Sequence, residues 1–132
     1  MFEIIRNIGS ITRKLQIQSN QKFNSLNLGN NRFIYIIRIC ESPGMFLGEI
    51  ADQLSIDRTT AFRTIKNLEK LGYLNTIEDS KDKRLRRIYP TNLASEIYSE
   101  LHFFEQFSSE TLLQKLNNQE KEQLLQLLKK IM

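Results

Sequence analysis

The chain has 132 residues, of which 40% are hydrophobic, so it can form one domain with a real core but not two ordinary domains. No apolar run approaches the ~20 residues that a membrane helix needs, and the first residues lack a signal-peptide cleavage site. We therefore expect a cytoplasmic protein without a membrane partner, in which the single cysteine, Cys40, forms no internal disulfide.

The net charge of +4 is concentrated in one part of the chain. Residues 57–87 hold nine Lys and Arg against five Asp and Glu, while the remaining residues carry equal numbers of each sign. This clustering is typical of a surface that binds a polyanion, although a solvated basic face without a partner has the same composition.

The sequence of the first half of the chain predicts a series of helices. Apolar residues recur at helical spacing from Phe2 to about Phe23, and a second helix is expected over 31–41. Two short helices follow in MFLGEIADQLS and DRTTAFRTIKNLEKLG, with Asp57 as the N-cap of the later one and Gly72 as its left-handed end. This order predicts a helix-turn-helix arrangement.

The second half begins with two strand-like runs, YLNTIED and RLRRIYP, around the charged turn SKDK, and these predict a hairpin wing. The residues expected to face inward from it are Leu74, Ile77, Leu85 and Ile88. Thr91 can cap a helix from Asn92 to about Leu116, with Ser108-Ser109 as a candidate interruption, and a last helix is expected over 118–131. The fold class is therefore mainly α with a small β-hairpin wing.

The helix expected over 57–71 has an outer face without carboxylates. At ~100° per residue, Ala61, Ile65 and Leu68 form a buried stripe, and polar residues gather on the opposite side. Their hydroxyl, guanidinium, ammonium and amide groups suit phosphate oxygens and base edges in a major groove. The candidate DNA-binding residues of this helix are Arg58, Thr59, Thr60, Arg63, Thr64, Lys66 and Asn67.

The hairpin expected over 73–90 has the same basic bias. A wing of this kind can insert arginine into a minor groove and neutralise the adjacent backbone. Two neighbouring basic elements therefore favour double-stranded DNA as the partner. The candidate residues of the wing are Lys81, Asp82, Lys83, Arg84, Arg86 and Arg87.

Residues 45–91 resemble the winged helix-turn-helix core of the MarR family of bacterial transcriptional regulators. The segment from Arg58 to Gly72 matches the family pattern R-S-T-[VA]-[ST]-R-x-[IL]-x-x-L-E-x-x-G, and Leu47–Ala51 matches the preceding helix loosely. The wing pattern D-x-R-x-x-x-[VI]-x-[LP]-T is matched by Asp82, Arg84, Ile88, Pro90 and Thr91. Two departures are Phe62, where the family often has a small or polar residue, and Ala94, which replaces a usual glycine.

The resemblance implies a single MarR-like domain over 1–132, with a DNA-binding core at 31–91 and dimerisation helices at 1–24 and 92–132. A homodimer would bind a palindromic operator, and repression is the commonest mode of the family. In the wing, the resemblance implies DNA contact by Arg84 and positioning of that arginine by Asp82. The dimerisation residues would be Ile4, Ile8, Ile11, Leu124, Leu128 and Ile131, which could otherwise complete a monomer core.

The resemblance also implies a small aromatic or lipophilic effector in a cleft. The candidate lining residues are Phe33, Tyr35, His102 and Phe103, whose aromatic rings could equally belong to the core. Relatives that sense oxidants use a cysteine in the first helix, whereas Cys40 ends the second, so no redox role is expected.

An enzyme is excluded because the chain has no glycine-rich phosphate loop and no Ser/His/Asp or Cys/His constellation. The single histidine cannot build a metal site with Cys40, so neither a metal nor a cofactor is expected. The alternative function is a winged-helix module that binds protein without specific DNA binding. The basic helix and wing argue against it, because lysine is depleted at protein–protein interface cores.

Overall fold

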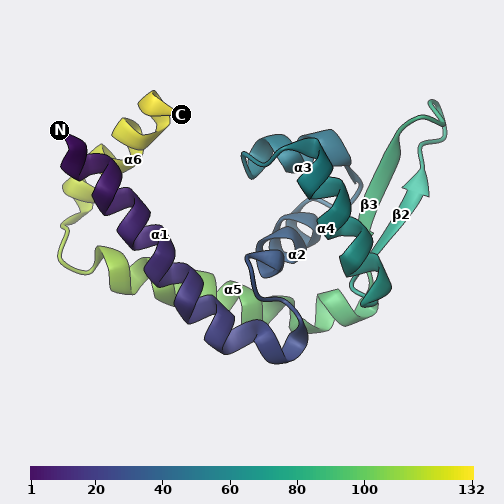
Figure 1. Cartoon of the computed structure of the whole chain (residues 1–132), viewed down its shortest axis with the longest axis horizontal. Helices are drawn as coiled ribbons and strands as arrows, with labels where there is room; N and C mark the ends of the chain where they lie inside the picture. The colour runs from purple at the N-terminus through teal and green to yellow at the C-terminus, as the bar shows by residue number, and fades with distance from the viewer. The chain divides into compact units, whose positions relative to one another are not determined.

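Six α-helices and a three-stranded sheet make up the computed structural model, which describes residues 1–132 (Figure 1). The chain divides into two compact units, Met1–His102 and Phe103–Met132, and the division falls within one helix. None of the helices combines the length and the hydropathy needed to cross a membrane. In chain order the elements are α1 (Phe2–Phe23), η1 (Asn24–Leu26), α2 (Arg32–Glu41), β1 (Met45–Phe46), α3 (Leu47–Gln53), α4 (Arg58–Lys70), β2 (Leu74–Glu78), β3 (Arg86–Pro90), α5 (Asn92–Leu113) and α6 (Asn118–Ile131).

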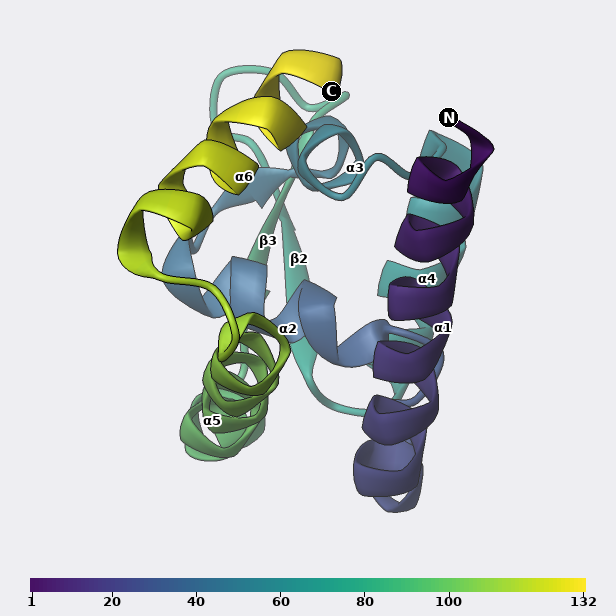
Figure 2. The same cartoon turned by 90° about the vertical axis from the view of Figure 1, so that its left-hand side faces the viewer.

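The core of the first unit lies around α2, which buries five of its ten residues. Helix α2 packs beside β3 and α4, and Figure 2 shows it next to the strands. The stripe predicted on α4 is confirmed, because Ala61, Ile65 and Leu68 are all buried. The phenol of Tyr73 donates a hydrogen bond to the carbonyl oxygen of Leu26 at 2.8 Å and so ties the end of α4 to η1.

The predicted helix ends around α4 and at the start of α5 are confirmed. The Asp57 carboxylate accepts a hydrogen bond from the amide of Thr60 at 2.8 Å, as expected of an N-cap. Gly72 has a φ of 85°, a left-handed conformation that glycine adopts without the steric cost of a Cβ. The hydroxyl of Thr91 accepts from the amide of Ala94 at 3.3 Å and caps the start of α5.

The strand β1 was not predicted, because its residues were assigned to the following helix. Met45 pairs with Ile88 and Phe46 with Arg87, so β1 adds an antiparallel strand to the wing in the order β1-β3-β2. Helix α3 begins only at Leu47. Two residues are too few to show an alternating pattern, so only the pairing with β3 reveals this strand.

The prediction of which wing residues face inward was half wrong. Leu74 and Ile88 are buried, but Ile77 and Leu85 are 57% and 41% exposed. Residues three apart on a strand point to opposite faces, so Leu74 and Ile77 cannot both face the core. The tip of the hairpin also extends beyond α3 and α4 (Figure 1).

Ser108-Ser109 was expected to interrupt or kink α5. The helix is continuous from Asn92 to Leu113, so the interruption is wrong, and the helix ends before Leu116. Helix α6, in the second unit, has the predicted bounds and begins with a capping box. In this box, the side chain of Asn117 accepts from the amide of Glu120 and the Glu120 side chain accepts from the amide of Asn117, both at 2.9 Å.

Candidate nucleic-acid interface

The N-terminal turn of α4 is built around the Asp57 cap. The Thr60 hydroxyl donates to the second carboxylate oxygen of Asp57 at 2.7 Å, in addition to the amide bond. These hydrogen bonds, the hydroxyl first and the amide second, lower the pKa of Asp57 and keep its carboxylate charged. The cap leaves Thr59, the neighbouring candidate, exposed in the first turn of the helix.

The seven candidate residues of α4 differ in exposure. Arg58, Thr59, Thr60, Arg63 and Lys66 are exposed, whereas Thr64 and Asn67 are half-buried. The Thr64 hydroxyl donates to the backbone carbonyl of Thr60 at 3.0 Å. The side-chain oxygen of Asn67 is buried without a hydrogen-bond partner. Arg63 forms no ion pair or hydrogen bond within the chain, so its five donors are free for a ligand.

Gly48 supports the placement of Arg58. A Cβ at this glycine would lie 3.3 Å from a guanidinium nitrogen of Arg58, so the missing side chain leaves room for that group. Helix α3 thus meets the start of α4 without covering its basic residues. The sequence motif around Gly48 did not reveal this relationship.

A chain of side-chain contacts joins α4 to the wing. Lys66 lies 3.6 Å from a carboxylate oxygen of Glu69, and the other carboxylate oxygen accepts a hydrogen bond from the hydroxyl of Thr76 on β2. Arg86 on β3 in turn donates to the Thr76 hydroxyl at 3.5 Å. These contacts connect two candidate DNA-binding residues, Lys66 and Arg86, through the wing base.

Asp79 holds the wing turn together and was missed by the sequence analysis, which counted it only as an opposing charge. Its carboxylate accepts from the guanidinium of Arg87 at 2.9 Å and from the amides of Lys81 and Asp82 at 3.2 and 3.0 Å. These bonds, with the Arg87 bond as the largest cause, lower the pKa of Asp79. The one signal in the sequence that could have indicated this role is an acidic residue directly before the basic turn of the hairpin.

Arg87 is anchored inside the chain. Besides Asp79, its guanidinium donates to the backbone carbonyl of Gly44 at 3.0 Å and lies 4.3 Å from the ring centroid of Phe46. The structure therefore joins β1, β3 and the wing turn through one arginine. Of the predicted wing residues, Arg87 is the one whose guanidinium is most engaged by the protein itself.

The tip of the wing presents Arg84. Two nitrogens of its guanidinium donate to the two carboxylate oxygens of Asp82 at 3.0 and 2.9 Å, and the Arg84 side chain is still 89% exposed. This fork raises the pKa of Arg84 and lowers that of Asp82. Lys81 and Lys83 are exposed beside it and form no ion pair.

We expect Asp79→Asn to destabilise the protein at neutral pH. The variant should also lose less stability than the wild type when the pH is lowered. The folded pKa of Asp79 lies below its ordinary value of about 4, so its stabilising effect is complete above that pH. The effect is lost as the pH falls through the folded pKa. Urea unfolding between about pH 7 and pH 3 measures both changes.

The exposed neighbour Glu78 provides a matched control, because it forms no ion pair. Glu78→Gln should leave the acid dependence of the free energy of unfolding unchanged. If the free energy of unfolding depends on pH equally in the wild type and in Asp79→Asn, Asp79 does not hold the wing.

The aromatic residues predicted to line an effector cleft have different environments. Phe33 and Tyr35 are buried in α2, and the Phe33 ring lies 5.0 Å from that of Phe23. Burial raises the pKa of the Tyr35 phenol, against the opposing effect of a hydrogen bond with Thr64. His102 and Phe103 are exposed on α5. Phe33 and Tyr35 therefore serve the core that supports α4.

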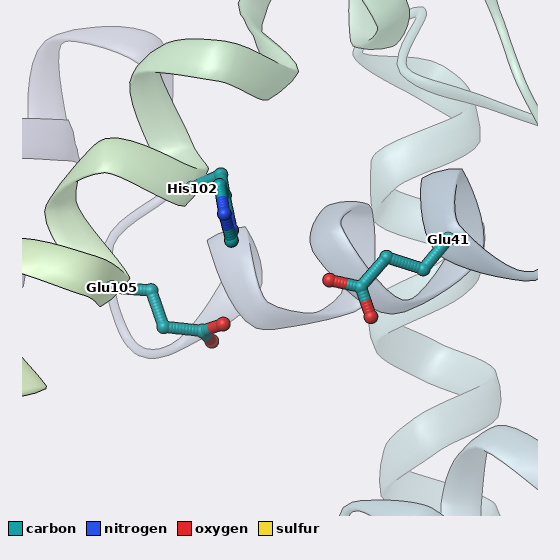
Figure 3. A group of neighbouring side chains, drawn as sticks. All are labelled: Glu41, His102 and Glu105. Carbon is teal, nitrogen blue, oxygen red and sulfur yellow. The ribbon is translucent and has the colours of Figure 1, made fainter.

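His102 has a neighbour that the sequence did not suggest. The Glu41 carboxylate, at the end of α2, comes within 4.8 Å of a ring nitrogen of His102, and Glu105 lies one turn further along α5 (Figure 3). The Glu41 carboxylate also accepts a hydrogen bond from the phenol of Tyr98 at 3.4 Å and lies 3.8 Å from the guanidinium of Arg38. Because its carboxylate is shared among protein groups and is exposed, we assign no metal to it.

Cys40 is half-buried beside Glu41. Burial first, and the charge of Glu41 second, raise the pKa of its thiol. A higher pKa lowers the fraction of reactive thiolate, which is consistent with the expectation that Cys40 has no redox role.

Comparison with known proteins assigns this arrangement to a family. A profile of the MarR family matches residues 28–85 of the chain. Over 131 residues the chain is 34% identical to the uncharacterized HTH-type transcriptional regulator YybA of Bacillus subtilis (strain 168), covering 99% of this chain and 87% of that protein. The chain belongs to the MarR family.

Solved structures of MarR-family regulators agree closely with the fold. The crystal structure of the transcriptional regulator SlyA has a TM-score of 0.92 and 38% identity, covering 97% of this chain and 90% of that one. A MarR family transcriptional regulator from Listeria monocytogenes, solved with a 26mer DNA, has a TM-score of 0.91 and 37% identity, covering 96% and 85%. This MarR-family protein is therefore a transcriptional regulator with a winged-helix fold, not an enzyme.

Proposed function

We propose that this MarR-family regulator is a homodimer that represses transcription by binding a palindromic operator in double-stranded DNA. The recognition helix 57–71 would enter the major groove, and the wing 73–90 would reach the adjacent minor groove. The observation that carries the proposal is the acid-poor outer face of α4, connected to the basic wing through Glu69 and Thr76. The DNA bound to the Listeria relative supports the same assignment.

The environments of the candidate residues suggest different roles. Arg63 is free of internal contacts and can form a bidentate contact with guanine. Arg84, already oriented by Asp82, suits a narrow minor groove. Lys81 and Lys83 suit phosphates. In this proposal Asp79 and Arg87 position the wing.

We propose that the dimer interface is formed by the apolar faces of the terminal helices α1 and α6. On α1, Ile4, Ile8 and Ile11 are 47%, 38% and 37% exposed, although they recur at the spacing of one helix face. The faces of α6 show the same feature, with Leu124 and Leu128 both 37% exposed and Ile131 68% exposed. Apolar faces of this kind mark interaction surfaces. Two symmetric half-sites about 34–36 Å apart would follow.

Release of the DNA by a small aromatic or lipophilic ligand is the last part of the proposal. His102 and Phe103, exposed on α5, are the accessible members of the predicted lining, since Phe33 and Tyr35 are buried. A panel of small phenols added to the protein–operator complex would test it. Retention of the complex at every concentration would remove the ligand from the proposal.

The test of the main proposal is a pull-down of genomic DNA fragments with the purified protein at two salt concentrations. An enriched palindrome that survives moderate salt would support a sequence-specific dimeric regulator. Salt-sensitive binding without enrichment would contradict sequence specificity, because phosphate contacts alone produce it. Absence of binding at both salt concentrations would favour the protein-interaction module.

We expect Arg84→Ala to weaken binding to the operator and also to random DNA, because the wing contact is lost from both. If Arg84 neutralises one phosphate in the groove, the slope of log affinity against log salt should fall by about one. Fluorescence anisotropy across a salt series measures this slope. Lys14→Ala, which removes an exposed basic residue from α1, should leave the slope unchanged, and an unchanged slope for Arg84→Ala would refute the contact.

A further inference from the structure

Phe62 is an apolar side chain in the middle of a polar surface. It lies on the second turn of α4 and is 50% exposed, while the buried stripe of that helix is already complete with Ala61, Ile65 and Leu68. Single exposed apolar residues are common on protein surfaces. What distinguishes Phe62 is its position one helical turn from both Arg58 and Lys66, within the surface that we assign to DNA.

The ring of Phe62 lies next to one of these basic neighbours. The ammonium of Lys66 lies 5.5 Å from the ring centroid and 3.6 Å from a carboxylate oxygen of Glu69. Glu69 also accepts from Thr76, so the ring, the ammonium and the wing base are connected. Phe62 is therefore an exposed apolar surface beside a cation that can neutralise a phosphate.

One group on the floor of the major groove suits such a surface best. The edges of the base pairs present mainly hydrogen-bond donors and acceptors, and their largest apolar group is the C5 methyl group of thymine. A phenyl ring against any donor or acceptor would remove its water without replacing the hydrogen bond. Against the methyl group, both partners lose apolar surface to solvent.

We propose that Phe62 is a specificity-determining residue that contacts the C5 methyl group of one thymine in each operator half-site. The inference rests on the proposed function, since it requires α4 to lie in the major groove. It adds an apolar base contact that the charged and amide groups of Arg63, Lys66 and Asn67 do not make. The family pattern, which often has a small or polar residue at this position, gives no reason to expect it.

Thymine-to-uracil replacement tests the contact, because uracil keeps every hydrogen-bonding group of thymine and lacks only the methyl group. The operator recovered by pull-down would be scanned one thymine at a time in each half-site. Burial of about one methylene-equivalent predicts a loss of roughly fourfold at one thymine, and of roughly 15-fold when its symmetric partner is replaced as well. Phe62→Ala should bind the thymine and uracil duplexes equally at that position.

Two further measurements separate loss of the methyl contact from a general effect of the substitution. Phe62→Leu retains an apolar side chain and should retain part of the discrimination, and thermal unfolding should verify that both variants fold. If the wild type binds its operator specifically but no thymine-to-uracil replacement weakens binding, this inference alone is overturned. The same holds if Phe62→Ala still binds the thymine duplex more tightly than the uracil duplex. Failure of the wild type to enrich any DNA would overturn the proposed function and the inference with it.

Discussion

Replacement of Arg63 with alanine is expected to lower the affinity for the operator by about tenfold to a hundredfold and to change the affinity for random DNA much less. One bidentate arginine–guanine contact contributes about 1–3 kcal/mol of discrimination, and tenfold corresponds to ~1.4 kcal/mol. Arg63 is suited to this contact because it is exposed on α4 and no carboxylate of the chain engages its guanidinium. Competition binding of the operator against random duplex measures the ratio directly.

Arg63→Lys is the matched variant, since it retains the charge and removes the planar fork of donors. If Arg63 reads a base, the lysine variant should lose most of the discrimination and keep its affinity for random DNA. If alanine weakens both DNAs by the same factor and lysine restores both, Arg63 contacts a phosphate instead. The two outcomes differ in the affinity ratio, so a general loss of stability cannot imitate the first.

The parts of the fold that were predicted correctly depend on short-range rules. Asp57 and Thr91 cap helices within three residues of themselves, and Gly72 ends α4 by its own backbone conformation. The missed strand, by contrast, depends on partners distant in sequence. Strand β1 exists only because Met45 and Phe46 pair with β3, more than forty residues later. No local pattern in two residues contains that information.

The candidate interface shows the same limit. The sequence identified the basic helix and wing, and the pairing of Asp82 with Arg84, two residues apart, has the expected geometry. Sequence composition alone could not separate Arg87 from Arg86 and Arg84, since all three contribute one charge. Their different roles follow from Asp79 and Phe46, whose contacts with arginine side chains are with Arg87 alone.

The opposite-charge pairs of the wing therefore change how its net charge should be interpreted. Asp79 and Asp82 subtract from the basic total, yet each carboxylate orients an arginine and is kept ionised by it. A wing of lysines alone would have a higher charge and a less defined shape. Rigid placement of a few donors favours discrimination between sequences, whereas charge alone favours binding to all of them.

Replacement of Ile8 with glutamate is expected to convert the proposed dimer to a monomer and to lower the affinity for the operator by about a hundredfold or more. Ile8 lies on the exposed apolar face of α1 with Ile4 and Ile11, and in a symmetric interface each substitution introduces two buried charges. A monomer also loses the effective concentration that joins two half-sites, which is worth about 10²–10⁴ in affinity. Light scattering after gel filtration and operator titration measure the two effects.

Ile17→Glu is the control for this substitution, because Ile17 is 58% exposed on the same helix and lies about half a turn around it from Ile8. Glutamate is a good helix former at both positions, so α1 should persist in each variant. The control should remain dimeric and bind the operator like the wild type. If Ile8→Glu stays dimeric, or if Ile17→Glu dissociates the dimer to the same extent, the face of α1 formed by Ile4, Ile8 and Ile11 is not the interface.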